Sequence, residues 1–159
     1  MASNYFVRVK GKKQGDFKGE MGKNQTEIPI LGFAYAVVSP RDPLSGLPTG
    51  QRQHKPVTIM KEWGPASVQF FSAMAANEDL TTVVIREMRA GLTGISQVYM
   101  EIRLTNANIA GIQIDPQRVD NLPVWTKEEI EQISFTFQRI EIEDFASNSS
   151  ATDDWEGRV

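Results

Sequence analysis

Residues 39–62, SPRDPLSGLPTGQRQHKPVTIMKE, change character near their middle. The first half contains three prolines and two glycines, which interrupt helices and strands, so we predict an irregular loop over residues 39–53. In the second half Val57 and Ile59 alternate with Thr58, which predicts a strand over residues 55–62. Proline lowers the entropy that an exposed loop loses on ordering. We therefore interpret the loop as an arm that contacts a neighbouring subunit.

Apolar residues before the arm predict two strands. Three alternating apolar side chains share one face of a strand over residues 5–10. Residues 27–38 form a second apolar strand, in which the parity of the apolar positions changes at Leu31 and Gly32. A glycine at such a change is typical of a β-bulge or a sharp bend. We expect this strand to turn a corner there.

Four apolar segments after the arm predict four further strands, over residues 81–89, 98–104, 107–114 and 131–143. Thr105 and Asn106 separate two of these segments and predict a tight turn. The last strand changes parity after Gln138, as expected of a strand that contacts two different surfaces. Segments rich in glycine, proline or polar residues predict loops over residues 11–26 and 115–127 and a flexible tail over residues 145–159.

One helix is predicted, over residues 67–77. Ser67 is suited to cap its first turn. Apolar side chains recur at helical spacing and form a stripe that Phe70 extends: Val68, Phe71, Met74 and Ala75. We interpret this stripe as core packing against the sheet and not as a cofactor site.

The composition describes an ordinary globular chain. Its 159 residues are 40% hydrophobic and 23% charged, which suits one domain with a hydrophobic core. With 17 basic and 20 acidic residues the net charge is −3, so no basic footprint for nucleic acid is present. No cysteine occurs, which excludes disulfides and thiolate chemistry. We find no secretory signal and no apolar run long enough to cross a bilayer.

The residues suggest no catalytic, metal or cofactor site. His54 is the only histidine, and without cysteines it has no natural partners for a zinc site. The carboxylates at Glu128, Glu129 and Glu131 crowd the start of a strand, and Glu141 and Glu143 form the polar face of a strand. No phosphate-binding glycine motif occurs. We expect His54 to make hydrogen bonds at the base of the arm and not to perform catalysis.

Several segments in this order resemble the haemolysin-coregulated protein (Hcp) family, which forms the inner tube of type VI secretion systems. The resemblance is carried by SPRD at residues 39–42, GQRQHKPVTI at 50–59, the Phe70-Phe71 pair, the strand pair over residues 98–107, and ISFTFQRI at 133–140. Together these segments span most of residues 5–143. The R-x-H-K-P-V-T-I run followed by L-T-N-A and I-S-F-T-F-Q-x-I is more specific than any single motif.

The resemblance implies a mainly β fold: a compact two-sheet β-barrel with one flanking α-helix and a long extended loop between strands two and three. We expect residues 1–144 to form this domain. The family assembles into hexameric rings that stack head to tail into a hollow tube and carry effectors. The expected partners are further copies of the chain, the sheath, baseplate and tip spike of the secretion system, and effector proteins. Assembly would be cytoplasmic and export would need no signal peptide; family members are not usually enzymes.

The arm is the predicted contact between subunits. A ring needs two different patches on each subunit, and an arm that reaches a neighbour supplies one of them. Charged side chains on the arm are suited to set the register of the contact. The predicted interface and stacking residues are Arg41, Asp42, Leu44, Leu47, Gln51, Arg52, His54 and Lys55.

Two other functions are compatible with the residues. One is a monomeric β-barrel that binds a small apolar ligand within a lining of Phe33, Tyr35, Phe135 and Phe137, although a barrel of this size is normally filled by its own side chains. The other is a small hydrolase that uses His54 with Asp42 or a serine. Native mass distinguishes a ring from the ligand-binding monomer, and loss of an activity in His54→Ala would indicate the hydrolase.

Overall fold

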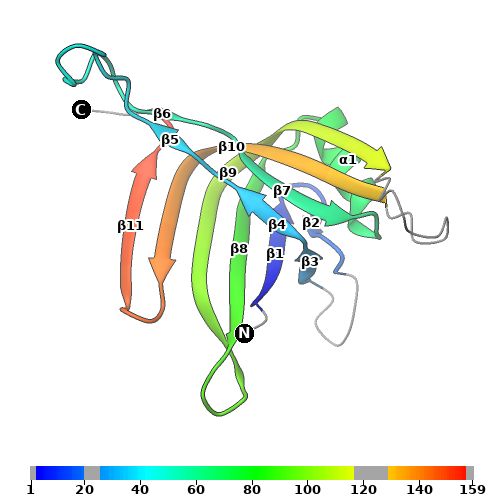
Figure 1. Ribbon diagram of the computed structural model, residues 1–159. Helices are drawn as coiled ribbons and strands as arrows, with labels where there is room; N and C mark the ends of the chain where they lie inside the picture. Colours follow the sequence, from blue (N-terminus) through cyan, green and yellow to red (C-terminus); the bar gives the residue numbers. More distant parts are fainter. Residues whose placement is uncertain (1–2, 20–25, 117–128, 157–159) are drawn as a thin grey trace.

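Antiparallel strands form the body of the computed structural model, which describes residues 3–19, 26–116 and 129–156 (Figure 1). The main sheet has the strand order β2-β1-β8-β9-β10-β7-β4, with β3 also paired to β1 and β11 also paired to β10. Its strands are β1 (Ser3–Gly11), β2 (Gly15–Asp16), β3 (Ile28–Ile30), β4 (Gly32–Ala34), β7 (Val57–Glu62), β8 (Leu80–Ala90), β9 (Ser96–Pro116), β10 (Glu129–Asp144) and β11 (Ser149–Asp154). The predicted mainly β fold with one flanking helix is confirmed.

The segment made of β3 and β4 connects the two sides of the main sheet. β3 pairs with β1, whereas β4 pairs with β7. Between them the Leu31 amide donates a 2.7 Å hydrogen bond to the Met60 carbonyl. The predicted corner at Leu31 and Gly32 is therefore confirmed, and it is the point at which the chain changes its partner strand.

The core lies on one face of the long strands and continues under the helix. Alternate residues of β1, β7 and β10 are hidden from solvent, which is the period-2 pattern predicted from the sequence, whereas β8 buries three successive residues, Val83, Val84 and Ile85. Fully buried members include Val7, Ile59, Ile85, Leu104 and Phe135. The aromatic residues considered as a ligand lining belong to this packing: Phe135 and Phe137 are in the core, and Phe33 and Tyr35 pack against it.

The predicted tight turn at Thr105 and Asn106 is wrong, because β9 continues through it as a single strand of 21 residues. Asn106 takes a left-handed conformation, with φ of 50°, and its Nδ2 donates to Gln138 Oε1 of β10 at 2.7 Å. Asparagine tolerates this conformation better than most residues. The chain thus bends within the sheet instead of leaving it. The predicted parity change of β10 after Gln138 is confirmed, because Phe137 and Ile140 are both buried although they lie three residues apart.

The helix α1 (Ala66–Ala75) buries a different face from the one predicted. Val68, Phe71 and Met74 are 63%, 66% and 39% exposed, whereas Phe70 and Ala73 are buried. The prediction failed because the helix contains no charged residue, so helical periodicity alone does not distinguish its two apolar stripes. Phe70 instead packs edge-on against Phe17 and Phe135, at centroid distances of 5.0 and 6.2 Å.

Ser67 does not cap the helix as predicted. The N-cap residue is Pro65, which makes no side-chain capping bond. Ser67 is buried, and its hydroxyl donates to Glu131 Oε2 at 2.6 Å and accepts from Lys61 Nζ at 3.1 Å. The residue chosen as a cap is therefore a link between the helix and the strands β7 and β10.

The C-terminal segment forms a strand where a flexible tail was expected. β11 pairs with β10 from Arg139 opposite Asp154 to Asp144 opposite Ser149. The Asp144 carboxylate accepts hydrogen bonds from the amide and hydroxyl of Ser147 in the connecting turn. The polar composition of this segment was misleading because the hydrogen bonds between paired strands are made by backbone groups, which polar residues supply as well as apolar ones.

The two predicted loops are described in part. Residues 11–19 contain the short strand β2 and the fully buried Phe17, so this segment contributes to the core. Residues 20–25 of the first loop and 117–127 of the second lie outside the described residues. Within the described part of the chain, no helix has the length and apolarity needed to span a bilayer.

Candidate functional site: the arm and its base

The predicted arm is an antiparallel hairpin and not an irregular loop. β5 (Val37–Val38) pairs with β6 (Gln53–His54) in a separate two-stranded sheet, and we call residues 37–54 the arm. Pairing continues outward through a bridge between Arg41 and Pro48. Prolines are accommodated because they contribute carbonyls: Pro40 accepts from the Thr49 amide at 3.0 Å. The arm extends away from the main sheet (Figure 1).

The tip of the arm is a hydrogen-bonded turn organised by Asp42. The Asp42 carboxylate accepts from the Ser45 hydroxyl at 2.7 Å and the Leu44 amide at 3.2 Å. These two bonds, the hydroxyl first, lower the pKa of Asp42 below its ordinary value. The Asp42 carbonyl accepts from the Gly46 amide at 2.8 Å, and Gly46 has φ of 73°, a conformation in which glycine is unstrained.

The arm presents apolar side chains to solvent. Leu44 is 96% exposed and Leu47 is 64% exposed at the tip, and Val37 and Val38 are about half exposed nearer the base. The tip is thus an ordered turn that carries two leucines clear of the protein surface.

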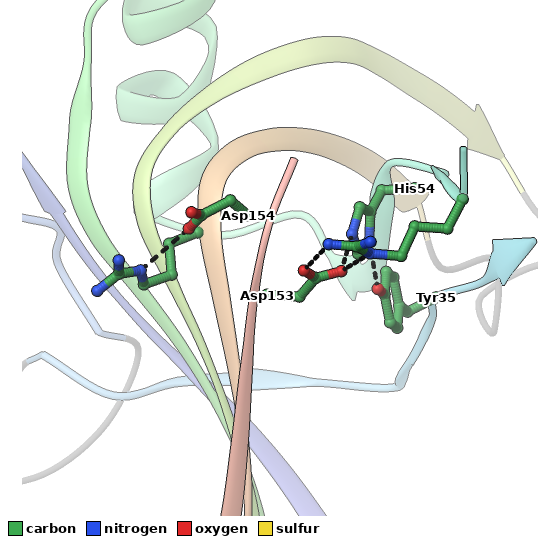
Figure 2. Close-up of polar contacts among 6 residues, drawn as sticks. Tyr35, His54, Asp153 and Asp154 are labelled. Atoms are coloured by element: carbon green, nitrogen blue, oxygen red, sulfur yellow. Dashed lines mark hydrogen bonds and ion pairs between the residues drawn. The ribbon is translucent and has the colours of Figure 1, made fainter. Parts of the chain in front are cut away.

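His54 occupies the base of the arm. It is 7% exposed, and its two ring nitrogens each lie 2.7 Å from a partner: Nδ1 from the hydroxyl of Tyr35, and Nε2 from Oδ2 of Asp153 in β11 (Figure 2). Burial, followed by the negative charge of Asp153, raises the pKa of Tyr35. The prediction of a hydrogen-bonding histidine at the arm base is confirmed.

Arg52 binds the same carboxylate as His54. Its Nε donates to Asp153 Oδ2 at 2.5 Å, and its Nη2 donates to Asp153 Oδ1. This forked arrangement matches guanidinium to carboxylate, and it holds the pKa of Asp153 well below its usual range, with His54 as a further cause. One carboxylate of the C-terminal strand therefore binds two side chains from the returning half of the arm, those of Arg52 and His54.

Aromatic rings surround the imidazole of His54. The ring of Phe137 meets it edge-on at 5.5 Å, and the ring of Trp155 lies roughly parallel to it at 6.0 Å. Phe137 and Trp155 also contact each other, at 4.9 Å. The base is thus a packed aromatic cluster around one polar network.

The eight predicted contact residues divide into two groups. Of those at the tip and along the arm, Asp42 is half-buried and the others are exposed: Arg41, Leu44, Leu47, Gln51 and Arg52. His54 is buried at the base, and the exposed Lys55 follows it, with its amide bonded to the Ala36 carbonyl at 2.9 Å. The pairing of His54 with Asp42 considered for a hydrolase does not form, because both groups have other partners.

Sequence reasoning missed the partners of the base. Asp153 and Trp155 fall in the segment assigned to a flexible tail, and Tyr35 was assigned only to packing. The single available signal was His54 itself, because a buried histidine requires hydrogen-bond partners. Across residues 3–19, 26–116 and 129–156, no three histidine, cysteine or acidic side chains are grouped to hold a metal ion.

A surface cavity of about 750 Å³ lies beside the base. Phe137 and Trp155 contribute to its wall, and polar groups supply most of the rest: Thr105, Asn108, Thr136, Gln138, Arg139, Asp154 and Glu156. The cavity therefore opens beside β11 and shares only Phe137 with the lining considered for an apolar ligand.

Solved structures of Hcp proteins share this fold. A crystal structure of an Hcp protein has a TM-score of 0.89 over 99% of this chain and 100% of its own, at 24% identity. The secreted protein Hcp3 from Pseudomonas aeruginosa has a TM-score of 0.79, with 98% and 100% coverage, also at 24% identity. These likenesses define the class of fold: an Hcp-type β-barrel.

The chain belongs to the Hcp family of type VI secretion proteins. The family model described as "Type VI secretion system effector, Hcp" matches residues 6–143. A protein of Pseudomonas aeruginosa strain PAO1, called the major exported protein, is 31% identical over 170 residues, which covers all of this chain and 99% of that protein. The family predicted from the sequence motifs is confirmed.

Proposed function

We propose that the chain is the structural subunit of a type VI secretion tube, in which hexameric rings stack into a hollow tube that carries effector proteins. Family membership supports the tube role. The observation that carries the assembly role is the arm: an ordered hairpin that holds Leu44 and Leu47 out from the barrel. The protein acts without catalysis, is assembled in the cytoplasm with sheath, baseplate and spike components, and is then exported.

The arm suits the contact that a ring requires. A ring is built from heterologous contacts, in which one patch of a subunit meets a different patch of its neighbour. The tip is preordered by Asp42, so little entropy is lost when it docks. Arg41 and Gln51 are exposed on the arm and Lys55 is exposed at its base, so they are suited to set the register, whereas Arg52 is already bound within its own subunit.

The test is the mass of the purified protein and of a tip variant. Light scattering coupled to size exclusion should give a several-fold multiple of the chain mass, and negative-stain microscopy should show rings. Leu44→Ser with Leu47→Ser should lower the assembled fraction at least tenfold without changing the unfolding temperature, because both side chains are exposed.

Leu92→Ser is the matched control, since Leu92 is fully exposed on the β8–β9 turn, outside the arm. It should assemble like the parent. If the parent protein stays monomeric at every concentration, the proposed tube role is wrong and the ligand-binding module is favoured. A tip variant that assembles normally would remove the arm from the interface.

A further inference from the structure

The arm is joined to the main sheet through the paired strands β4 and β7, and the hydrogen bond from the Lys55 amide to the Ala36 carbonyl is the link between the two ladders. β5 and β6 pair only with each other in the described residues, and a two-stranded hairpin is marginally stable by itself. Beyond this short backbone link, its direction relative to the barrel depends on side chains at its base. The polar contacts there are those of Arg52 and His54 with Asp153, and of His54 with Tyr35.

The strand that supplies Asp153 has little other anchorage. Four of the six side chains of β11, Ser149 to Thr152, are exposed, so the strand buries almost no apolar surface. Apart from its ladder with β10, the contacts that hold β11 lie at its C-terminal end. Asp153 binds the arm, Asp154 accepts a hydrogen bond from Arg139 at 3.1 Å, and the adjoining Trp155 packs against His54. Asp153 and Asp154 reach different partners, one on the arm and one on the sheet (Figure 2).

We infer that β11 is a latch for the arm and that Asp153 is the positioning residue which couples the two. Docking of β11 holds the arm in its extended direction, and ordering of the arm holds β11 on the sheet. Because such coupling is reciprocal, a neighbouring subunit that binds the arm also stabilises β11. A partner that displaces β11 releases the arm. The inference rests on the proposed assembly role of the arm and identifies β11 as the element that controls the position of the arm.

Adjacent residues provide a matched pair for the test. Asp153→Asn removes the charge that binds the arm, whereas Asp154→Asn removes a neighbouring charge that binds Arg139. Arg52→Gln breaks the same contact from the arm and changes only an exposed side chain, which guards against a folding defect in Asp153→Asn. Asp153→Glu preserves the charge and should restore part of the effect.

Amide hydrogen exchange of the full chain is the readout, followed by mass spectrometry of peptides covering residues 37–54 and 149–154. Asp153→Asn and Arg52→Gln should each raise exchange in both segments roughly tenfold, as expected when hydrogen bonds to a charged group are lost. Exchange in β8 should stay unchanged, and Asp154→Asn should leave the arm unchanged. Equal effects of the two asparagine variants on the arm, or no effect of Arg52→Gln on β11, would overturn the latch.

Assembly separates this inference from the proposed function. In the parent, rings should show slower exchange of β11 than dissociated subunits. If the parent forms no rings, the tube role fails while the exchange of the single subunit still tests the latch. If rings form and arm exchange is the same in the parent and Asp153→Asn, the latch fails and the tube role stands.

Discussion

Lys61 and Glu131 form a completely buried ion pair, with Nζ and Oε2 3.0 Å apart and both side chains hidden from solvent. Lys61 also donates to the Glu62 carbonyl at 2.7 Å, and the Ser67 hydroxyl bridges the two charges. The pair therefore joins β7 and β10 to the first turn of α1. A buried charge is tolerated only when it is paired and hydrogen-bonded, and here both conditions are met.

Removal of one member of this pair should be strongly destabilising. Glu131→Ala leaves the Lys61 charge buried without its counterion, and we expect the free energy of unfolding to fall by about 3–5 kcal/mol. Urea denaturation measures the loss. Glu129→Ala, in the same strand but exposed, should change stability by less than about 0.5 kcal/mol. A loss below about 1 kcal/mol for Glu131→Ala would show that the pair is not buried as described.

The orientation of α1 predicts losses of stability of very different size for two adjacent phenylalanines. Phe70 is fully buried between Phe17 and Phe135, so Phe70→Ala should cost about 3–5 kcal/mol. Phe71 is 66% exposed, so Phe71→Ala should cost less than about 1 kcal/mol. Chemical denaturation of both variants gives the comparison. The reverse order would mean that the stripe predicted from helical spacing faces the core.

Asn106 should tolerate glycine but not valine. Its φ of 50° lies in the left-handed region, where a β-branched residue is strained. Asn106→Val should lower stability by about 1–3 kcal/mol, whereas Asn106→Gly should lose only the bond to Gln138, roughly 1 kcal/mol. Thermal unfolding distinguishes the two. Equal losses would indicate that β9 has no left-handed residue at this point.

The contribution of Asp153 to stability should depend on pH in one direction. Arg52, and then His54, lower the pKa of Asp153 in the folded protein, so the unfolded chain binds the proton more readily. The stabilisation is complete above the unfolded pKa of about 3.9 and is lost as the pH falls through the lower folded pKa. The difference in unfolding free energy between the parent and Asp153→Asn should be present at pH 5 and shrink towards pH 2. A difference that grew on acidification would contradict the carboxylate's role.

Much of the barrel was predictable from the sequence because strands alternate. The positions of β1, β7 and β10 follow from period-2 spacing, which directly records the side chains that face the core. The corner at Leu31 and Gly32 was predictable for the same reason, since a bend must shift the parity of the positions that follow it. The motif around His54 identified the family, and its prolines and glycines located the arm.

Other features were decided only by the tertiary structure. Two apolar stripes on an uncharged helix are equivalent until the neighbouring residues Phe17 and Phe135 select one of them. β11 is formed by backbone hydrogen bonds that its polar composition does not reveal. His54 and Asp153 are 99 residues apart in the sequence and meet only because β11 returns along β10 to the base of the arm. Local patterns determine which residues point inward, whereas the choice of a distant partner requires the assembled sheet.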